Sequence, residues 1–290
     1  MVEQPMRVDQ PLQAIGWAFL ATFCFLGIDA LIKHLSGTLH PFFIAQLRML
    51  FGFLIWMPIL VPRKFSPMKV SKFRLHLLRG LLGAAGSLAS YMGLAMAPFA
   101  KVQSLYFTIP IFGVMFGFLL LREVPSRSQV ACIALGAVGV FIIVQPDEGI
   151  LQIGSAIVLV SSIIHGLIAV VIRKMAQTES SLSITIWMNL TVGFFLLPFA
   201  LPQASMPGWH DMFLVIAMTL CGTAGQYCNA RALEIGQASV VLPIEYSKVI
   251  WAPLIGWIFF AEDTPVTTVV GALVIISGMM VMTRSAASAK

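Results

Sequence analysis

Apolar segments of about 20 residues recur along the whole chain, separated by short polar or Pro/Gly breaks. A helix of roughly 20 apolar residues crosses the hydrocarbon core of a bilayer, which is about 30 Å thick. The segments are 13–34, 41–61, 76–96, 101–121, 128–145, 152–174, 183–202, 210–233, 239–261 and 265–283. The pattern therefore predicts an all-α membrane protein with ten transmembrane helices.

The composition excludes a soluble globular protein. Hydrophobic residues make up 59% of the 290 residues and charged residues 10%, whereas a soluble domain has about 45–50% and about 25%. The four cysteines lie inside apolar segments and lack the spacing of a zinc or redox site. We therefore predict neither a metal nor a cofactor.

Lysine and arginine residues divide unequally between the two ends of the predicted helices. With the N-terminus in the cytoplasm, thirteen of them fall on the cytoplasmic side, and only Lys33 and Lys101 fall on the opposite side. Positive residues are retained on the cytoplasmic side of membrane proteins. Both termini are therefore predicted inside, and the formal net charge of +6 needs no nucleic-acid partner to explain it.

The chain resembles itself at a shift of 139 residues without gaps. This shift aligns Gly83 with Gly222, Gly86 with Gly225, Glu123 with Glu262 and Gly139 with Gly278. We predict two five-helix repeats, at 13–146 and 152–284. Because five is odd, the second repeat enters the membrane from the opposite side, and such inverted repeats are typical of secondary transporters. Duplication that built only a scaffold is the alternative.

Residues 78–146 and their counterparts in the second half resemble the EamA-type members of the drug/metabolite transporter superfamily. The features that carry the resemblance are Arg79-Gly80, Pro98, Ala100, Pro110, Glu123, Gly136, Gly139 and Pro146, then Ile244-Glu245-Tyr246, Leu254 to Trp257 and Phe260-Ala261-Glu262. One departure is Val249, where the family has a proline, so the bend in the ninth helix is expected elsewhere. The resemblance implies a metabolite transporter of the bacterial inner membrane. Members carry amino acids, vitamins, cofactors and toxic compounds, and some take up S-adenosylmethionine.

One cluster of ionisable residues is predicted slightly inside the membrane midplane. Glu245 and Lys248 are three residues apart and share a helix face, with Arg231 and His165 on nearby helices. An ion pair within the membrane is one interpretation. The other is a binding site for a zwitterion, in which Glu245 takes the cationic group and Lys248 the carboxylate. His165 and Glu245 could also carry protons during transport.

A second cluster is predicted toward the outer end. Asp29 and Lys33 are four residues apart on the first helix and can pair, and Arg48 on the second helix lies at a similar depth. We interpret this cluster as a charge network that closes the outer end, with a role in coupling or gating as the alternative. Glu262, which directly follows the ninth helix, is expected to cap a helix end or to contribute to a gate, as is its counterpart Glu123.

Aromatic and amide side chains add candidates for substrate binding: Tyr91, Tyr106, Trp251, Gln103 and Asn229. An aromatic cage favours organic cations through cation–π attraction, although tyrosine and tryptophan also line membrane interfaces. Tyr106 aligns with Glu245 at the shift of 139 residues, so two related helices present polar groups at corresponding depths. This correspondence favours a central pocket.

We therefore expect a secondary transporter that moves a zwitterionic or cationic metabolite by alternating access, coupled to protons or to exchange. A passive channel or facilitator and a non-transporting membrane scaffold are the alternatives. The sequence contains no nucleotide-binding or hydrolase motif, so we do not expect an enzyme. The expected partners are a small-molecule substrate and the lipid bilayer, with a homodimer as a further possibility.

Overall fold

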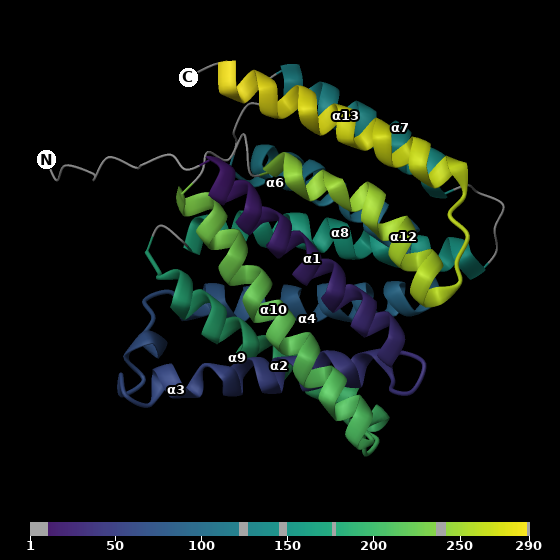
Figure 1. Ribbon diagram of the computed structural model, residues 1–290. Helices are drawn as coiled ribbons and strands as arrows, with labels where there is room; N and C mark the ends of the chain where they lie inside the picture. Colours follow the sequence, from purple (N-terminus) through teal and green to yellow (C-terminus); the bar gives the residue numbers. More distant parts are fainter. Residues whose placement is uncertain (1–10, 122–126, 145–149, 176–177, 236–241, 289–290) are drawn as a thin grey trace, which may run out of the picture.

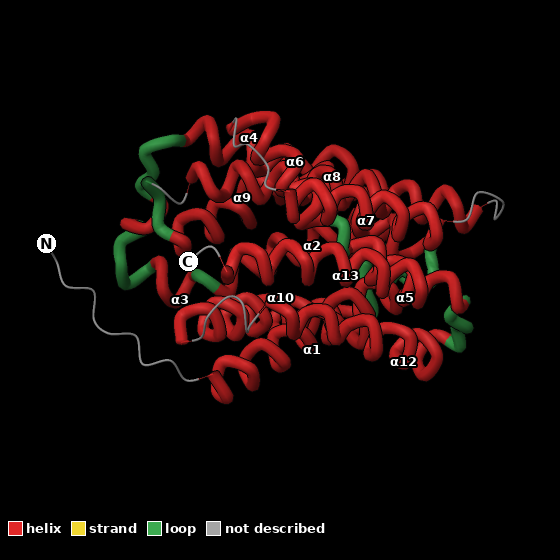
Figure 2. The backbone as a smooth tube through the Cα atoms, turned by 90° about the horizontal axis from the view of Figure 1, so that it is seen from above, coloured by secondary structure: helices red, strands yellow, loops and turns green. Residues whose placement is uncertain are grey.

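The computed structural model describes residues 11–121, 127–144, 150–175, 178–235 and 242–288, and the regular elements within these ranges are all helical (Figure 2). The first half contains α1 (Pro11–Leu35), α2 (Pro41–Ile55), α3 (Met57–Leu60), the 3₁₀ turn η1 (Ser66–Met68), α4 (Phe73–Met96), α5 (Phe99–Tyr106), α6 (Ile109–Leu121) and α7 (Arg127–Val144). The second half contains α8 (Ile150–Met175), α9 (Ser181–Ala200), η2 (Leu201–Gln203), α10 (Trp209–Ile235), η3 (Leu242–Ser247), α12 (Lys248–Phe260) and α13 (Val266–Ser288).

The helices have the length and surface of a multi-pass membrane protein. Five helical segments are long and apolar enough to cross a bilayer, namely Leu12–Leu35, Pro41–Leu60, Phe99–Leu120, Ile153–Ile172 and Leu182–Gln203. Shorter apolar helices occupy Val130–Ile143, Lys248–Phe260 and Val266–Val281. Large apolar side chains face outward, including Phe141 at 70% and Phe259 at 71% exposure. Lipid is the solvent that accommodates such a surface.

The helix boundaries repeat at the same shift of 139 residues that aligns the sequence. Shifted in this way, α1 covers nearly the whole of α8, and α6 coincides with α12 from its first residue to its last. Likewise, α4 and α10 end at corresponding residues, and α7 and α13 begin at corresponding residues. The two halves therefore share one helix pattern.

The principal contacts between helices join the two halves and follow the same correspondence (Figure 1). Helix α1 packs along α10, and their counterparts α8 and α4 pack along each other. Helices α7 and α13, which correspond, lie side by side at one edge of the bundle, and α2 and α9 make a similar pair at the opposite edge. The helices of each half pack mainly against helices of the other half, so the two halves form one body.

Glycines permit the closest of these contacts. A Cβ atom at Gly86 on α4 would lie 3.2 Å from Ile164 on α8, and one at the corresponding Gly225 on α10 would lie 3.0 Å from Phe25 on α1. At the contact of α7 with α13, a Cβ on Gly139 would lie 2.7 Å from the carbonyl oxygen of Gly271, closer than side-chain carbons approach. Small residues at such crossings let helix backbones approach closely within membranes.

The fourth and ninth predicted helices are both interrupted, and at corresponding places. Helix α5 ends at Tyr106 and α6 begins at Ile109, with Pro110 in its first turn. In the second half the 3₁₀ turn η3 ends at Ser247 and α12 begins at Lys248. Proline lacks the N–H that a continuous helix requires at this point, which explains the first interruption. The second occurs at the corresponding place although Val249 stands where the family has a proline, so the expectation that this bend would lie elsewhere is wrong.

We predict that Gly139→Ala lowers the melting temperature of the detergent-purified protein. The added methyl must push α7 away from α13, and such overpacking typically costs about 1–3 kcal/mol. The control is Gly16→Ala on α1, where an added Cβ would have nothing within 4 Å. Equal melting temperatures for the two variants would show that the α7–α13 crossing tolerates separation.

Candidate functional site

A cavity of about 470 Å³ lies among α1, α2, α4, α5, α6, α8, η3, α12 and α13, next to the interruptions of the two broken helices. Ligand pockets in proteins commonly measure about 300–1,000 Å³. The lining residues are Phe25, Ile28, Asp29, Ile32, Arg48, Ser87, Ser90, Tyr91, Gln103, Tyr106, Phe107, Ile109, Pro110, His165, Glu245, Lys248 and Met279. Irregular backbone at membrane depth is tolerated where it lines such a cavity.

Two acidic and two basic side chains line this one cavity: Asp29, Glu245, Arg48 and Lys248. The sequence analysis assigned them to two separate clusters, with Asp29 and Arg48 toward the outer end. That division is wrong, because α1 and α2 pack against the second half and bring Asp29 and Arg48 to the same space as Glu245 and Lys248. The cavity is therefore amphoteric, with charges of both signs.

Glu245 and Lys248 form a loose pair. The Nζ atom of Lys248 lies 3.9 Å from Oε1 of Glu245, and the Glu245 side chain is 44% exposed. The same Nζ lies 5.5 Å from the centre of the Phe25 ring. Direct charge-assisted hydrogen bonds are about 2.7–2.9 Å long. Both groups therefore keep hydrogen-bonding capacity for a third partner in the cavity.

Asp29 and Arg48 each contact a neutral side chain. Oδ2 of Asp29 accepts a hydrogen bond of 2.8 Å from Nε2 of Gln103. A guanidinium nitrogen of Arg48 lies 3.4 Å from the hydroxyl oxygen of Tyr91, which is a long hydrogen bond. Among the residues that the structure describes, no carboxylate forms an ion pair with Arg48. A guanidinium has five N–H donors, so Arg48 can still bind an anionic group in the cavity.

Lys33 does not pair with Asp29, contrary to the expectation from their spacing. Its Nζ forms an ion pair of 2.9 Å with Oε1 of Glu262 and donates to the carbonyl oxygen of Ala97 at 2.7 Å. The other carboxylate oxygen of Glu262 accepts from the backbone N–H of Phe99 at 2.7 Å. Glu262 therefore caps the start of α5, as expected, while Lys33 ties α1 to both halves. Glu123, the counterpart of Glu262 in the first half, lies outside the described residues.

Tyr106 and His165 line the cavity, and each has one polar partner residue among the described hydrogen bonds. The hydroxyl groups of Tyr106 and Ser90 share a short hydrogen bond. His165 Nδ1 lies 2.8 Å from the carbonyl oxygen of Ser161, one turn earlier on α8. Tyr106 and Glu245, which align at the shift of 139 residues, both reach the cavity, so the predicted correspondence of polar groups is present in the geometry.

Three candidates from the sequence do not line the cavity: Trp251, Asn229 and Arg231. Trp251 on α12 packs instead against Phe23 of α1, with ring centres 5.0 Å apart. Asn229 and Arg231 belong to α10, and α1 packs along α10 and supplies the cavity wall on that side. The positions of Asn229 and Arg231 along their own helix do not show which neighbouring helix packs against them.

Ser87 and Ser90 on α4 are cavity residues that the sequence analysis did not select. Their spacing of three residues places both hydroxyls on one face of the helix, in its mainly apolar second half. That pattern was the available signal. Single serines in membrane helices commonly bond to their own backbone, so the pattern alone does not separate them from structural serines.

A helical membrane protein built from two corresponding halves, with broken helices around a central polar cavity, has the architecture of secondary transporters. Comparison with known sequences identifies a transporter family. The EamA-like transporter family matches the chain twice, over residues 12–145 and 152–284. The protein therefore belongs to the EamA-like transporter family.

Three relatives illustrate the range of this family. The S-adenosylmethionine uptake transporter of Rickettsia prowazekii is 23% identical over 265 residues, covering 91% of this chain and 90% of the relative. The riboflavin transporter of Vibrio cholerae is 23% identical, covering 94% of each. The pseudopaline exporter of Pseudomonas aeruginosa is 23% identical, covering 97% of this chain and 99% of the relative.

A solved crystal structure supports the fold. It aligns with a TM-score of 0.63 at 18% sequence identity, covering 96% of this chain and 98% of the other. At that identity the likeness concerns the arrangement of helices alone.

We predict strong coupling between Lys33 and Glu262. Lys33→Met leaves the carboxylate of Glu262 without its cation and should lower the melting temperature, and Glu262→Gln should do the same. In the double variant the second substitution should cost much less, because the pair is already broken. Residues in contact show coupling energies of about 0.5–3 kcal/mol. Additive effects in a double-mutant cycle would mean that the pair contributes nothing as a unit.

Proposed function

We propose that this protein is a secondary transporter that carries a small zwitterionic or cationic metabolite across the bacterial inner membrane. The observation that carries the proposal is the amphoteric cavity, in which Asp29, Glu245, Arg48 and Lys248 surround a volume sufficient for a small metabolite. Ionisable groups within a membrane cost roughly 2.5–3.5 kcal/mol each and usually mark a substrate or ion pathway. Four such groups around one space support a binding site better than a structural role.

Each charge has a proposed role in binding. Arg48 anchors a substrate carboxylate, because its guanidinium has open donors and no carboxylate partner among the described residues. Asp29 and Glu245 receive a cationic group, assisted by the faces of Tyr106 and Phe107. Lys248 neutralises Glu245 while the site is empty. In this arrangement the charges of a bound zwitterion replace the pairing between Lys248 and Glu245.

S-adenosylmethionine fits this charge pattern, because it combines an amino-acid group with a sulfonium cation. A relative at 23% identity is named as its uptake transporter. Other relatives are named for riboflavin and pseudopaline, so the family name alone does not select a substrate. Within the proposal, S-adenosylmethionine and amino acids are the first compounds to test.

The proposed mechanism is alternating access between two inverted five-helix repeats, 13–146 and 152–284, with ten spans and both termini inside. The correspondence of the halves and the paired interruptions at the cavity support it. The Lys33–Glu262 pair would then close the outer end, because it ties α1 to the turn before α5 and to the end of α12. His165 and Glu245 are the proposed proton carriers if transport is coupled to protons.

We predict that cationic or zwitterionic ligands raise the melting temperature of the purified protein, and that Glu245→Gln and Arg48→Gln abolish the rise. A ligand at 100 times its Kd stabilises the folded form by about 2.7 kcal/mol. A screen of amino acids, betaines, sulfonium compounds and vitamins measures this shift. The matched control is Asp211→Asn, which removes an acid at the start of α10, outside the cavity. Ligands that stabilise both cavity variants as well as the wild type would place the binding site elsewhere.

We further predict that Lys33→Met increases access to the cavity from outside the cell. With Cys24, Cys132, Cys221 and Cys228 replaced by alanine, a Ser87→Cys probe should react faster with a membrane-impermeant maleimide once the pair is broken. A Thr38→Cys probe, exposed at the turn between α1 and α2, should react at the same rate in both backgrounds. An unchanged rate at residue 87 would mean that the pair does not close the outer end.

A further inference from the structure

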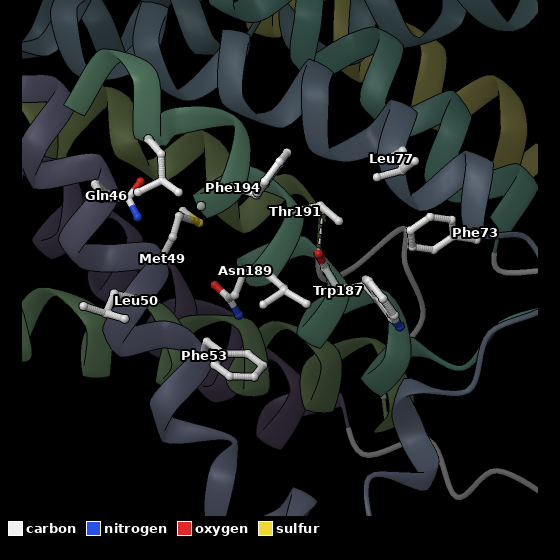
Figure 3. A pocket seen from close by; sticks show the side chains of 13 residues that line it. Gln46, Met49, Leu50, Phe53, Phe73, Leu77, Trp187, Asn189, Thr191 and Phe194 are labelled. Carbon is white, nitrogen blue, oxygen red and sulfur yellow. Dashed lines mark hydrogen bonds between the residues drawn. The ribbon is translucent and has the colours of Figure 1, made fainter. Parts of the chain in front are cut away.

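A second and larger cavity lies on the outside of the bundle, between α2, α4 and α9. Its volume is about 640 Å³, and its walls are mainly apolar, with Met49, Leu50 and Phe53 on α2, Leu77 on α4, and Phe194 on α9 (Figure 3). Leu190 on α9 also lines the cavity, and its polar side chains are Gln46, Asn189 and Thr191. We call this cavity the lateral groove. Leu50 at 49% and Phe194 at 65% exposure leave it open along its length.

The length of the lateral groove suits an acyl chain of one membrane leaflet. On α9 its lining residues extend from Trp187 to Leu197. Ten residues of helix span about 15 Å, which is half of the hydrocarbon thickness of about 30 Å. An open apolar groove of this length on a helix surface that faces lipid is filled by a hydrocarbon chain.

One end of the lateral groove is basic. Trp187 closes that end, where its indole Nε1 donates to the carbonyl oxygen of Met68 at 3.1 Å and its ring lies 5.3 Å from that of Phe73. These contacts hold the segment 61–75 beside the groove. The segment contains Arg63, Lys64, Lys69, Lys72 and Arg74 and no acidic residue.

Most of this charge is available to a ligand. Arg63, Lys64, Lys69 and Arg74 are exposed. Within the described residues, Glu179 is the acidic group bound to the segment, and its Oε1 accepts from the backbone N–H groups of Ser71 and Lys72 at 2.8 and 3.0 Å. One carboxylate against five cations leaves a strongly positive surface where the groove ends.

We propose that the lateral groove binds an anionic phospholipid. One acyl chain lies along α9 between α2 and α4, and the phosphate contacts the basic segment 61–75 beyond Trp187. The apolar wall accounts for the chain, and the positive charge selects the headgroup, because anionic lipids are attracted to clusters of basic residues next to membrane helices. The proposal depends on the chain being a membrane protein and is independent of the proposed substrate.

Charge also disfavours a second copy of this chain in the groove. The bias of lysine and arginine sets the same orientation for every copy, so two copies that pack through this groove would bring two basic segments together at the same membrane face. Anionic lipid neutralises that charge, whereas a second copy doubles it.

The test is native mass spectrometry of the purified protein titrated with phosphatidylglycerol or phosphatidylcholine of the same acyl chains. We expect wild-type protein to bind phosphatidylglycerol on the order of tenfold more tightly. Lys69→Gln/Arg74→Gln should remove this preference, and Leu190→Trp, which fills the lateral groove, should weaken binding of both lipids. Arg127→Gln, which removes an exposed charge at the start of α7, should leave the preference intact. Unchanged melting temperatures would verify that the variants are folded.

Three results would overturn the proposal. Equal binding of the two lipids by wild-type protein would show that the groove does not select anionic headgroups. Unchanged phosphatidylglycerol binding by Leu190→Trp would place the lipid outside the groove. A lipid-independent dimer that Leu190→Trp dissociates would identify a second copy as the occupant.

Discussion

The backbone of a membrane helix must satisfy its own hydrogen bonds, because the hydrocarbon core offers no water. In this protein two helices lose the regular α-helical pattern, at Phe107 and Thr108 between α5 and α6 and at the junction of η3 with α12 after Ser247. The two interruptions correspond at a shift of 139 residues and flank the same cavity, where irregular backbone is shielded from lipid. The position of the cavity and the packing of the surrounding helices depend on where this constraint is relaxed.

The charges follow from the same arrangement. A cavity enclosed by both halves receives Asp29 and Arg48 from the first half and Glu245 and Lys248 from the second. Their sum is near zero, so the empty site is tolerable in a medium of low dielectric constant. Lys33, only one turn beyond Asp29, has a different role, because its ammonium reaches the carbonyl oxygen of Ala97 and the carboxylate of Glu262 at the end of the bundle.

Much of the architecture was predictable from local patterns, and individual contacts were not. Apolar segments of membrane-spanning length, their repetition and the shared polar position of Tyr106 and Glu245 are properties of single helices. The helices overlap the predicted segments, but three of these segments, 41–61, 101–121 and 239–261, are each divided into shorter elements. The expected pairing of Asp29 with Lys33 relied on spacing along one helix. It fails because Glu262, remote in sequence, lies closer to Lys33. Trp251 is a candidate because it is an aromatic residue of the ninth predicted helix, but residue type does not determine which way a side chain faces.

The sequence by itself determined that the protein is surrounded by lipid, that it is helical and that it contains two similar halves. Each of these properties depends on residues that are close together in the sequence or that recur at one fixed shift. Only the tertiary structure decided that two apparent charge clusters form one amphoteric cavity. It also revealed the lateral groove, whose walls come from α2, α4 and α9. The physical reason is that a cavity is defined by the faces that several helices turn toward a common space. Those rotations are determined by packing, such as the approach of α1 to α10 at Gly225, and packing between distant segments leaves no local signature.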